Sequence, residues 1–246
     1  MRNLFLLPVI LFTVDAQPAN QNIDRVLHFK HTESTQALQE AVTVVRSITQ
    51  IAKVTLDAAQ KTLTLSAPAG QAATAEWLFN QLDQPLKPHA TAEFTTDSGD
   101  LVQVFYFAQP FVNKELQESA TVLRSIGQLK NLFVYSPIRA IVVRGSAADL
   151  RLAAWLVKEF DQPVNRPGFA PRVNEYRLFE NEDDILQVFY LAPTNTMQRL
   201  QGIATEVRST IRLPLLFTSN LHSAIVVRGT SAQLARAAQL IEQRDR

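Results

Sequence analysis

The stretch AIVVRGS at Ala140–Ser146 returns as AIVVRGT at Ala224–Thr230, and this repetition decides the fold. Between the first two copies the offset is 78 residues, both from Arg46 to Arg124 and from Trp77 to Trp155. Between the last two it is 84 residues, both from Arg124 to Arg208 and from Gly145 to Gly229. An offset that holds across a whole segment without gaps indicates three tandem copies of one small domain. A chain of repeated domains usually presents surfaces for interaction rather than one catalytic cleft.

The second copy predicts the order of elements within one domain. Val102–Phe107 is rich in branched and aromatic residues, which is typical of a strand. A helix is expected to follow, with Asn113 as its N-cap and its end near Leu129. Leu132–Tyr135 and Ala140–Val143 then predict two further strands.

A second helix is predicted to begin after Ser146, which can form a capping box with Asp149 three residues later. Thr230 and Gln233 repeat this arrangement in the third copy. The helix is expected to end at Asp161–Pro163, because proline disfavours helical backbone in the residue before it.

Each domain is therefore expected to follow the order strand, helix, strand, strand, helix. Two helices that cover one face of a three-stranded sheet give an α+β fold. Ala92–Thr96 and Glu175–Phe179 each precede an acidic, turn-prone segment. We expect a hairpin at these two places that adds a strand to the second and third copies.

The predicted domains span residues 17–88, 89–169 and 170–246. The first copy is degenerate, because TLTLS at Thr62–Ser66 stands where the other copies have IVVRG. Pro85–Pro88 and Pro163–Pro171 are expected to be linkers, and their prolines make them stiffer than a glycine-rich tether.

The N-terminus predicts export. Arg2 precedes the apolar run Leu4–Val14, which is too short to cross a bilayer as a helix. We interpret residues 1–16 as a signal peptide cleaved after Ala16, with a buried N-terminal strand or a short anchor as the alternative. A signal peptide predicts a periplasmic or secreted protein whose mature chain does not insert into a membrane. The absence of cysteine suits an exported bacterial protein without disulfides.

The IVVRG strand, followed by Leu156-Val157 and Asp161–Pro163, resembles the short periplasmic N-domains of bacterial secretins. Secretins build the outer-membrane rings of type II and type III secretion systems and of type IV pili. Ala224–Thr230, Leu240-Ile241 and Asp245 repeat the pattern. The resemblance implies a KH-like fold and packing of these domains into homo-oligomeric rings. It does not extend to the long membrane-inserting β domain of a secretin, so it implies interaction modules rather than a channel.

Trp77 and Trp155 are candidate contact residues between domains. Each precedes a leucine of the helical core stripe, so the tryptophan itself points elsewhere. The third copy has Gln239 at this position, and terminal repeats tend to be polar where inner repeats are apolar. We therefore expect Trp77 and Trp155 to pack against the following domain or its linker, with an external binding surface as the alternative.

Arg144 and Arg228 lie at the end of a predicted strand. A guanidinium there can pair bidentately with a carboxylate across a domain or subunit interface. The pattern favours the simpler interpretation of a solvated strand end with a local salt bridge. Arg46, Arg124 and Arg208 are expected at the edge of the helical core with their charge in water, or paired with Asp83 or Asp161.

No catalytic, cofactor-binding or metal site is predicted. The four histidines are scattered, and the sequence has no GxSxG, P-loop or dinucleotide-binding motif. Nucleic-acid binding is not expected, because Lys+Arg 24 nearly balance Asp+Glu 23 and the GXXG loop of a KH domain is absent. The sequence thus predicts an exported, non-enzymatic module that binds protein partners or itself, associated with a secretion or pilus apparatus. The alternative is an envelope enzyme or glycan-binding protein with a site between domains.

Overall fold

The computed structural model describes residues 22–87, 91–163, 172–178, 183–192 and 196–245. Within these ranges it contains six α-helices and three antiparallel sheets, which confirms the α+β fold class. None of the described helices has the length and hydropathy needed to cross a membrane. The predicted signal peptide, residues 1–16, lies outside the described ranges.

The first unit carries a three-stranded sheet in the order β1-β3-β2. Its elements are β1 (Ile23–His28), α1 (Thr35–Thr49), β2 (Lys53–Asp57), β3 (Thr62–Ala67) and α2 (Ala69–Leu82). Both helices contact the sheet of their own unit, α1 through β2 and α2 through β1 and β3.

The second and third units carry four strands each, in the orders β4-β5-β7-β6 and β8-β9-β11-β10. The second unit consists of β4 (Thr91–Thr95), β5 (Leu101–Tyr106), α3 (Asn113–Ser125), β6 (Asn131–Tyr135), a 3₁₀ turn (Ser136–Ile138), β7 (Ala140–Gly145) and α4 (Ala147–Phe160). The third consists of β8 (Arg172–Arg177), β9 (Ile185–Tyr190), α5 (Met197–Ile211), β10 (Leu215–Ser219), β11 (Ala224–Gly229) and α6 (Ser231–Asp245). The additional strands β4 and β8 lie where the sequence predicts hairpins.

The capping box of α4 forms as predicted, but the cap of α3 does not. Ser146 Oγ accepts from the Asp149 N–H, and the Asp149 carboxylate accepts from the Ser146 N–H at 2.9 Å. The predicted N-cap Asn113 is instead the first helical residue, and Val112 precedes it. Valine has no side-chain acceptor, so the Glu115 carboxylate alone serves this end by accepting from the Val112 N–H at 2.8 Å.

Helix α3 is also shorter than the sequence predicts. It ends at Ser125 instead of continuing to about Leu129. Past that end, the Gly127 N–H reaches back to the Val122 carbonyl and the Leu129 N–H to the Leu123 carbonyl. These bonds occupy carbonyl groups that the helix end would otherwise leave unsatisfied, so the chain turns out of the helix there.

The sequences of the central strands follow from how many faces of each sheet are covered. In β7 and β11 the residues of the AIVV stretch are buried on both faces of the sheet. In β3 the pattern TLTLS alternates, with Leu63 and Leu65 buried and Thr64 exposed. A sheet with one solvated face requires this alternation, whereas a sheet covered on both faces needs a continuous apolar run. The first copy therefore departs from IVVRG because its outer face meets water.

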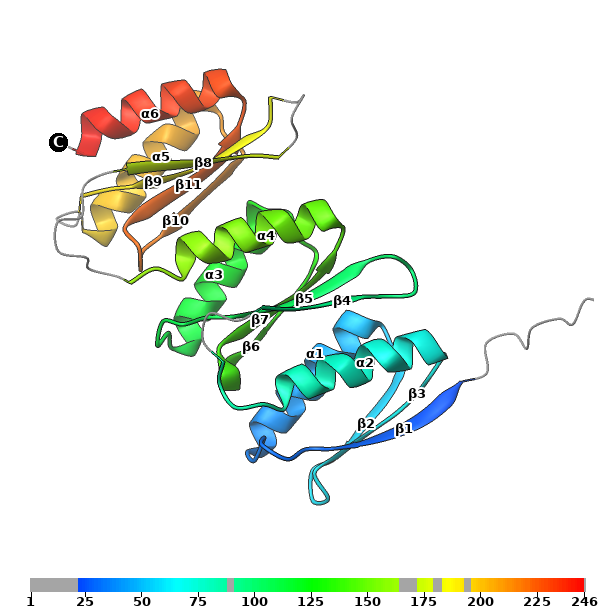
Figure 1. Cartoon of the computed structure of the whole chain (residues 1–246). Coiled ribbons are helices and arrows are strands. Elements are labelled where there is room, and N and C mark those ends of the chain that lie inside the picture. The colour runs from blue at the N-terminus through cyan, green and yellow to red at the C-terminus, as the bar shows by residue number, and fades with distance from the viewer. Residues whose placement is uncertain (1–21, 88–90, 164–171, 179–182, 193–195, 246) are drawn as a thin grey trace, which may run out of the picture.

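The outer face of each following sheet is covered by the helices of the unit before it. Helix α1 lies against β6 and β7, and α3 lies against β10. The hydrophobic core of the first unit accordingly extends to Val104 and Val142 of the second, and that of the second extends to Val188 and Val226 of the third. Figure 1 shows the resulting stack, in which sheets and helical layers alternate along the chain.

An aspartate at the end of the second helix fixes a loop in each unit. Asp83 accepts hydrogen bonds from the N–H groups of Lys30, His31 and Thr32 at 2.6–3.0 Å. Asp161 accepts from Ala108 and Gln109 in the second unit, and Asp245 accepts from Ala192 in the third. This aspartate, which begins the Asp-Gln-Pro motif in the first two units, therefore clamps the loop that leads into the first helix of its unit.

The Asp83 clamp predicts acid sensitivity. Burial raises the pKa of Asp83, but the three N–H groups and the Thr32 hydroxyl outweigh it, so the pKa lies below its usual value. A lowered folded-state pKa adds stability above the unfolded-state pKa, and this stability is lost as the pH falls through the folded-state pKa. We expect Asp83→Asn to lower the free energy of unfolding by about 2 kcal/mol at pH 7, and by less near pH 3, in urea titrations. Glu93→Gln, on the exposed face of β4, is the control, and an equal loss at both pH values would contradict the clamp.

Candidate functional site

Arg144 and Arg228 occupy equivalent positions at the two junctions between units. Arg144 donates to the Asp100 carboxylate of its own unit at 3.1 Å and to the Ile48 carbonyl, at the end of α1, at 3.0 Å. Arg228 lies beside Asp184 and donates to the Ile126 carbonyl, at the end of α3, at 3.2 Å.

The surroundings of these arginines differ from the solvated strand end that the sequence favours. Their side chains are only 14% and 11% exposed, and each makes its local salt bridge while also reaching the preceding unit. A cation at a helix C-terminus satisfies carbonyl groups that lack helical partners and interacts favourably with the helix dipole. Each guanidinium thus joins a carboxylate of one unit to a helix end of another.

A tyrosine repeats this pattern at the end of the second helix. The Tyr106 hydroxyl donates to the Gln81 carbonyl of α2 at 3.1 Å, and the Tyr190 hydroxyl donates to the Glu159 carbonyl of α4 at 3.2 Å. Burial raises the pKa of Tyr106 to about 12, so its hydroxyl keeps its proton and remains a donor. The last turns of both helices of one unit are therefore bound by the sheet of the next.

A glutamate on the first helix makes the reciprocal contact. Glu40 of α1 accepts from the Ser136 N–H of the second unit at 2.8 Å. Glu118 of α3 accepts from the Ser219 hydroxyl of the third unit at 2.7 Å. Gly202 stands at the equivalent position of α5 and offers no such acceptor. The glutamate is present in the two units that another unit follows.

Trp77 and Trp155 contact the additional strand of the following unit, which is β4 for Trp77 and β8 for Trp155. Trp77 of α2 stacks on Phe94 of β4 with ring centroids 5.3 Å apart. Trp155 of α4 contacts Tyr176 of β8 at 5.4 Å. Both tryptophans are half-buried. Aromatic pairs at such distances contribute roughly 0.5–1.5 kcal/mol beyond the area that they bury.

The third unit carries charged residues at two helix positions that are apolar and buried in the first two units. Glu206 replaces Val44 and Val122, and Arg244 replaces Leu82 and Phe160. Glu206 and Arg244 form a salt bridge of 2.6 Å on the outer surface of α5 and α6. At this end of the stack, a charged pair replaces the apolar side chains that cover a sheet.

The sequence of one copy does not identify the glutamates, tyrosines and aspartates of the junctions, but a comparison of the copies gives one indication. By the offset of 78 residues TLTLS aligns with AIVVR, one position earlier than IVVRG, so Ser66 is the residue of the first copy equivalent to Arg144 and Arg228. Likewise His28 stands where Tyr106 and Tyr190 are found. Comparing the first copy with the others distinguishes residues that need a preceding unit. Comparing the last copy with the first two distinguishes the residues that need a following unit, and this comparison identifies the tryptophans.

Arg46, Arg124 and Arg208 act within their own units. Each donates to a carbonyl of the strand that follows the first helix of its unit: Arg46 to Val54 at 2.6 Å, Arg124 to Leu132 at 3.0 Å, and Arg208 to Leu216 at 2.8 Å. The alternative of an ion pair with Asp83 or Asp161 does not form among the described residues: the guanidinium groups bind these strand carbonyls, and both carboxylates accept from backbone N–H groups. These arginines fasten the first helix to its own sheet.

The second junction also buries a histidine. His222 packs edge-on against Phe160 at 5.2 Å and Phe111 at 6.1 Å, and its Nδ1 lies 3.1 Å from the Ser219 hydroxyl. Burial lowers the pKa of His222 to about 4, against the opposing effect of the Phe160 and Gln162 backbone. The equivalent residue at the first junction is the buried Ile138.

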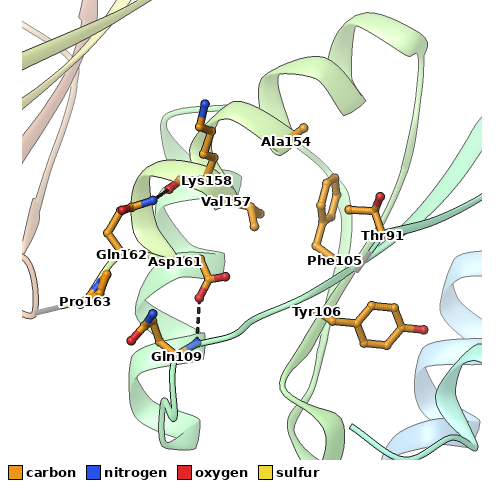
Figure 2. Close-up of a pocket in the computed structure, with 10 residues that line it drawn as sticks. All are labelled: Thr91, Phe105, Tyr106, Gln109, Ala154, Val157, Lys158, Asp161, Gln162 and Pro163. Atoms are coloured by element: carbon orange, nitrogen blue, oxygen red, sulfur yellow. Dashed lines mark hydrogen bonds between the residues drawn. The ribbon is translucent and has the colours of Figure 1, made fainter. Parts of the chain in front are cut away.

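Two hollows on the surface are lined by described residues. Figure 2 shows one beside α4 and β5, where Asp161 faces the Gln109 backbone and Lys158 lies along the helix. Another, at the first junction, is lined by hydroxyl groups together with Asp97 and Arg144. Within the described ranges, no three His, Cys, Asp or Glu side chains gather as metal ligands.

Comparison with known proteins gave structural matches only: no family model and no curated protein matches the chain. ExeD of Aeromonas hydrophila matches over 92% of this chain and 41% of its own, with 14% identity and a TM-score of 0.22. The secretin of an ETEC pilotin–secretin AspS–GspD complex matches over 92% and 38%, with 15% identity and a TM-score of 0.22. The structure named XcpQN012 matches over 92% and 100%, with 12% identity and a TM-score of 0.30.

The chain thus spans about two fifths of the length of the first two of these secretin chains. Identities and TM-scores this low do not show membership of the family.

The arginine junction predicts a measurable coupling between units. Arg144→Met should leave the Ile48 carbonyl and the Asp100 carboxylate without their shared donor, and we expect the free energy of unfolding to fall by about 1–3 kcal/mol. A double-mutant cycle with Asp100→Asn in urea titrations measures the part carried by the pair. Arg151→Gln, exposed on α4, is the matched control. Equal losses for Arg144→Met and Arg151→Gln would contradict the junction.

His222 predicts a pH dependence of the second junction. With a folded-state pKa of about 4 and an unfolded-state value near 6.5, the unfolded chain binds more protons between these limits. The associated stability, on the order of 3 kcal/mol, is complete above about pH 6.5 and is lost as the pH falls towards 4. We expect His222→Ile, which copies the first junction, to flatten this dependence. Trp155 fluorescence in a Trp77→Phe background follows the transition, and an unchanged pH profile would refute the assignment.

Proposed function

We propose that this protein is an exported, non-enzymatic scaffold of three KH-like domains, with boundaries at 17–88, 89–169 and 170–246, that binds protein partners in the cell envelope. The observation that carries the proposal is the repeated junction, in which Arg144 and Arg228 join a carboxylate of one unit to a helix end of the unit before it. A scaffold requires contacts that hold its units together, and the same arginine contact occurs at both junctions.

The junctions support a stack with fixed geometry. Each combines a buried apolar layer with contacts of arginine, tyrosine, glutamate and tryptophan that bind both helices of the preceding unit. Hydrogen bonds impose directional limits that an apolar contact alone does not. A fixed stack holds its exposed strands and surfaces at set distances, as a protein that aligns partners requires.

The sequence motifs support a place beside a secretion or pilus apparatus. Ala140–Ser146 and Ala224–Thr230, each followed by the second helix and its clamping aspartate, resemble the N-domains of secretins. Those domains belong to envelope assemblies that carry proteins or pili. An exported stack of similar domains would serve as an accessory component that contacts such an assembly.

The alternative of a glycan-binding protein has one observation in its favour. The hollow at the first junction is lined by Thr49, Thr96 and Ser98 together with one carboxylate, Asp97. Hydroxyl groups suit a sugar, but hydrolysis of a glycosidic bond ordinarily needs a pair of carboxyl groups flanking it. This geometry fits weak binding better than catalysis.

The scaffold proposal is tested by crosslinking in living cells. A photoreactive amino acid at Thr91 or Val173, both exposed on edge strands, should join the chain to proteins of a secretion or pilus apparatus. The same amino acid at Ala235, exposed on α6, is the control for random encounter. A rise in unfolding temperature with cell-wall glycan fragments, abolished by Asp97→Asn and accompanied by no protein crosslinks, would overturn the proposal.

A fixed stack also predicts a narrow distance distribution. The chain has no cysteine, so spin labels at Lys53→Cys and Arg236→Cys report one distance between the first and third units. We expect a single narrow peak that broadens when Arg144→Met and Arg228→Met are combined, with labelled chain diluted in unlabelled chain. Labels at Lys130→Cys and Arg151→Cys, within the second unit, should stay unaffected. A broad distribution in the unaltered protein would contradict a scaffold of fixed geometry.

A further inference from the structure

Strand β1 is an interior strand by sequence and an edge strand in the structure. Its counterparts β5 and β9 lie between two neighbours, with β4 and β8 on one side and β7 and β11 on the other. Among the described residues, β1 pairs only with β3. One side of β1 therefore presents backbone N–H and C=O groups without a strand partner, which makes it a template for another chain.

The side chains of β1 show the same difference. Asp24, Val26 and His28 share the outer face of the sheet and are exposed, with Val26 exposed by 56%. In β5 and β9 nearly all residues are buried or half-buried. The outer face of β1 thus holds an acidic residue, an apolar residue and a histidine in line, at successive positions on one face.

We propose that two copies of this protein associate through β1, which pairs antiparallel with β1 of the second copy about a two-fold axis through Val26. The pairing joins the two three-stranded sheets into one six-stranded sheet. This deepens the proposed scaffold function by naming one partner, a second copy of the chain. It gives the first sheet the neighbour that the other two obtain from β4 and β8.

The register follows from the side chains of the outer face. With Val26 facing Val26 of the second copy, Asp24 of each chain faces His28 of the other, so each carboxylate lies opposite an imidazole N–H that can donate to it. Hydrogen-bonded and opposite-charge pairs across neighbouring strands stabilise a sheet, and like charges directly opposite destabilise it. A shift by one position in each copy would instead place Arg25 against Arg25. The register centred on Val26 therefore opposes no like charges, whereas the one centred on Arg25 does, and an interface with two-fold symmetry requires such self-complementarity.

The inner face is compatible with the same register. Arg25 would face Leu27 of the second copy, where its aliphatic stem can cover the leucine, and its guanidinium lies 3.8 Å from Glu76 of α2. No like-charged pair directly opposes another on this face. Both faces of β1 thus permit the pairing that the outer face favours.

Charge exchange tests the register. In sedimentation equilibrium of the full chain purified after export, we expect a monomer–dimer equilibrium. Asp24→Lys removes the acceptor that faces His28, and His28→Asp places Asp opposite Asp24, so each should weaken the dimer roughly tenfold. The double variant Asp24→Lys/His28→Asp places Lys opposite Asp and should recover the dimer. A double variant as weak as the single ones would refute the register.

A matched valine pair tests the surface. Val26→Lys places two lysines on the two-fold axis and should give a monomer, whereas Val173→Lys, on the 50% exposed valine of β8, should leave the dimer intact. Circular dichroism confirms that both variants fold. A chain that stays monomeric at all concentrations, or that dissociates equally with both substitutions, overturns the proposal. If the spin-label distance distribution is still narrow in such a monomer, the dimer proposal is refuted and the proposal of a fixed scaffold is retained.

Discussion

The stack depends on one constraint: the outer faces of the second and third sheets are apolar and must be covered by the helices of the preceding unit. Val142 and Val226 lie on these faces and are fully buried. Covering an apolar face supplies most of the free energy of such packing, but apolar contact alone does not fix a register. The Arg144 and Arg228 contacts add direction, because each guanidinium fits one carboxylate and one helix end at a time.

Each end of the stack has a surface that no neighbouring unit covers, and the two ends make this surface polar by different substitutions. At the first unit the sheet faces water, and threonine replaces the outward valines, as at Thr64. At the third unit the helices face water, and Glu206 with Arg244 replaces apolar residues on α5 and α6. The terminal surfaces therefore offer little apolar area for further stacking. Association with another molecule is left to the strand edges, which lie at the sides of the stack.

Sequence predicts the elements of this fold well, because the three copies supply independent versions of one pattern. It is less reliable at helix ends. Asn113 is a favourable cap residue, yet Val112 occupies the position because the Glu115 carboxylate satisfies its N–H. The functions of Asp83 and Asp161 were also missed, because their partners are backbone N–H groups some fifty residues away. A sequence pattern does not record contacts to backbone.

The junction shows why a repeated residue needs every copy for its interpretation. Residues present in all three copies, such as Arg46 and its equivalents, bind within their own unit. Residues missing from the first copy, such as Arg144, face a unit that precedes, and residues missing from the last, such as Trp77, face a unit that follows. The position of the missing copy thus gives the direction of each contact. By this argument β4 and β8, which have no counterpart among the described residues of the first unit, bind the preceding helices through their outer faces, and the edge of β1 is left for a second copy of the chain.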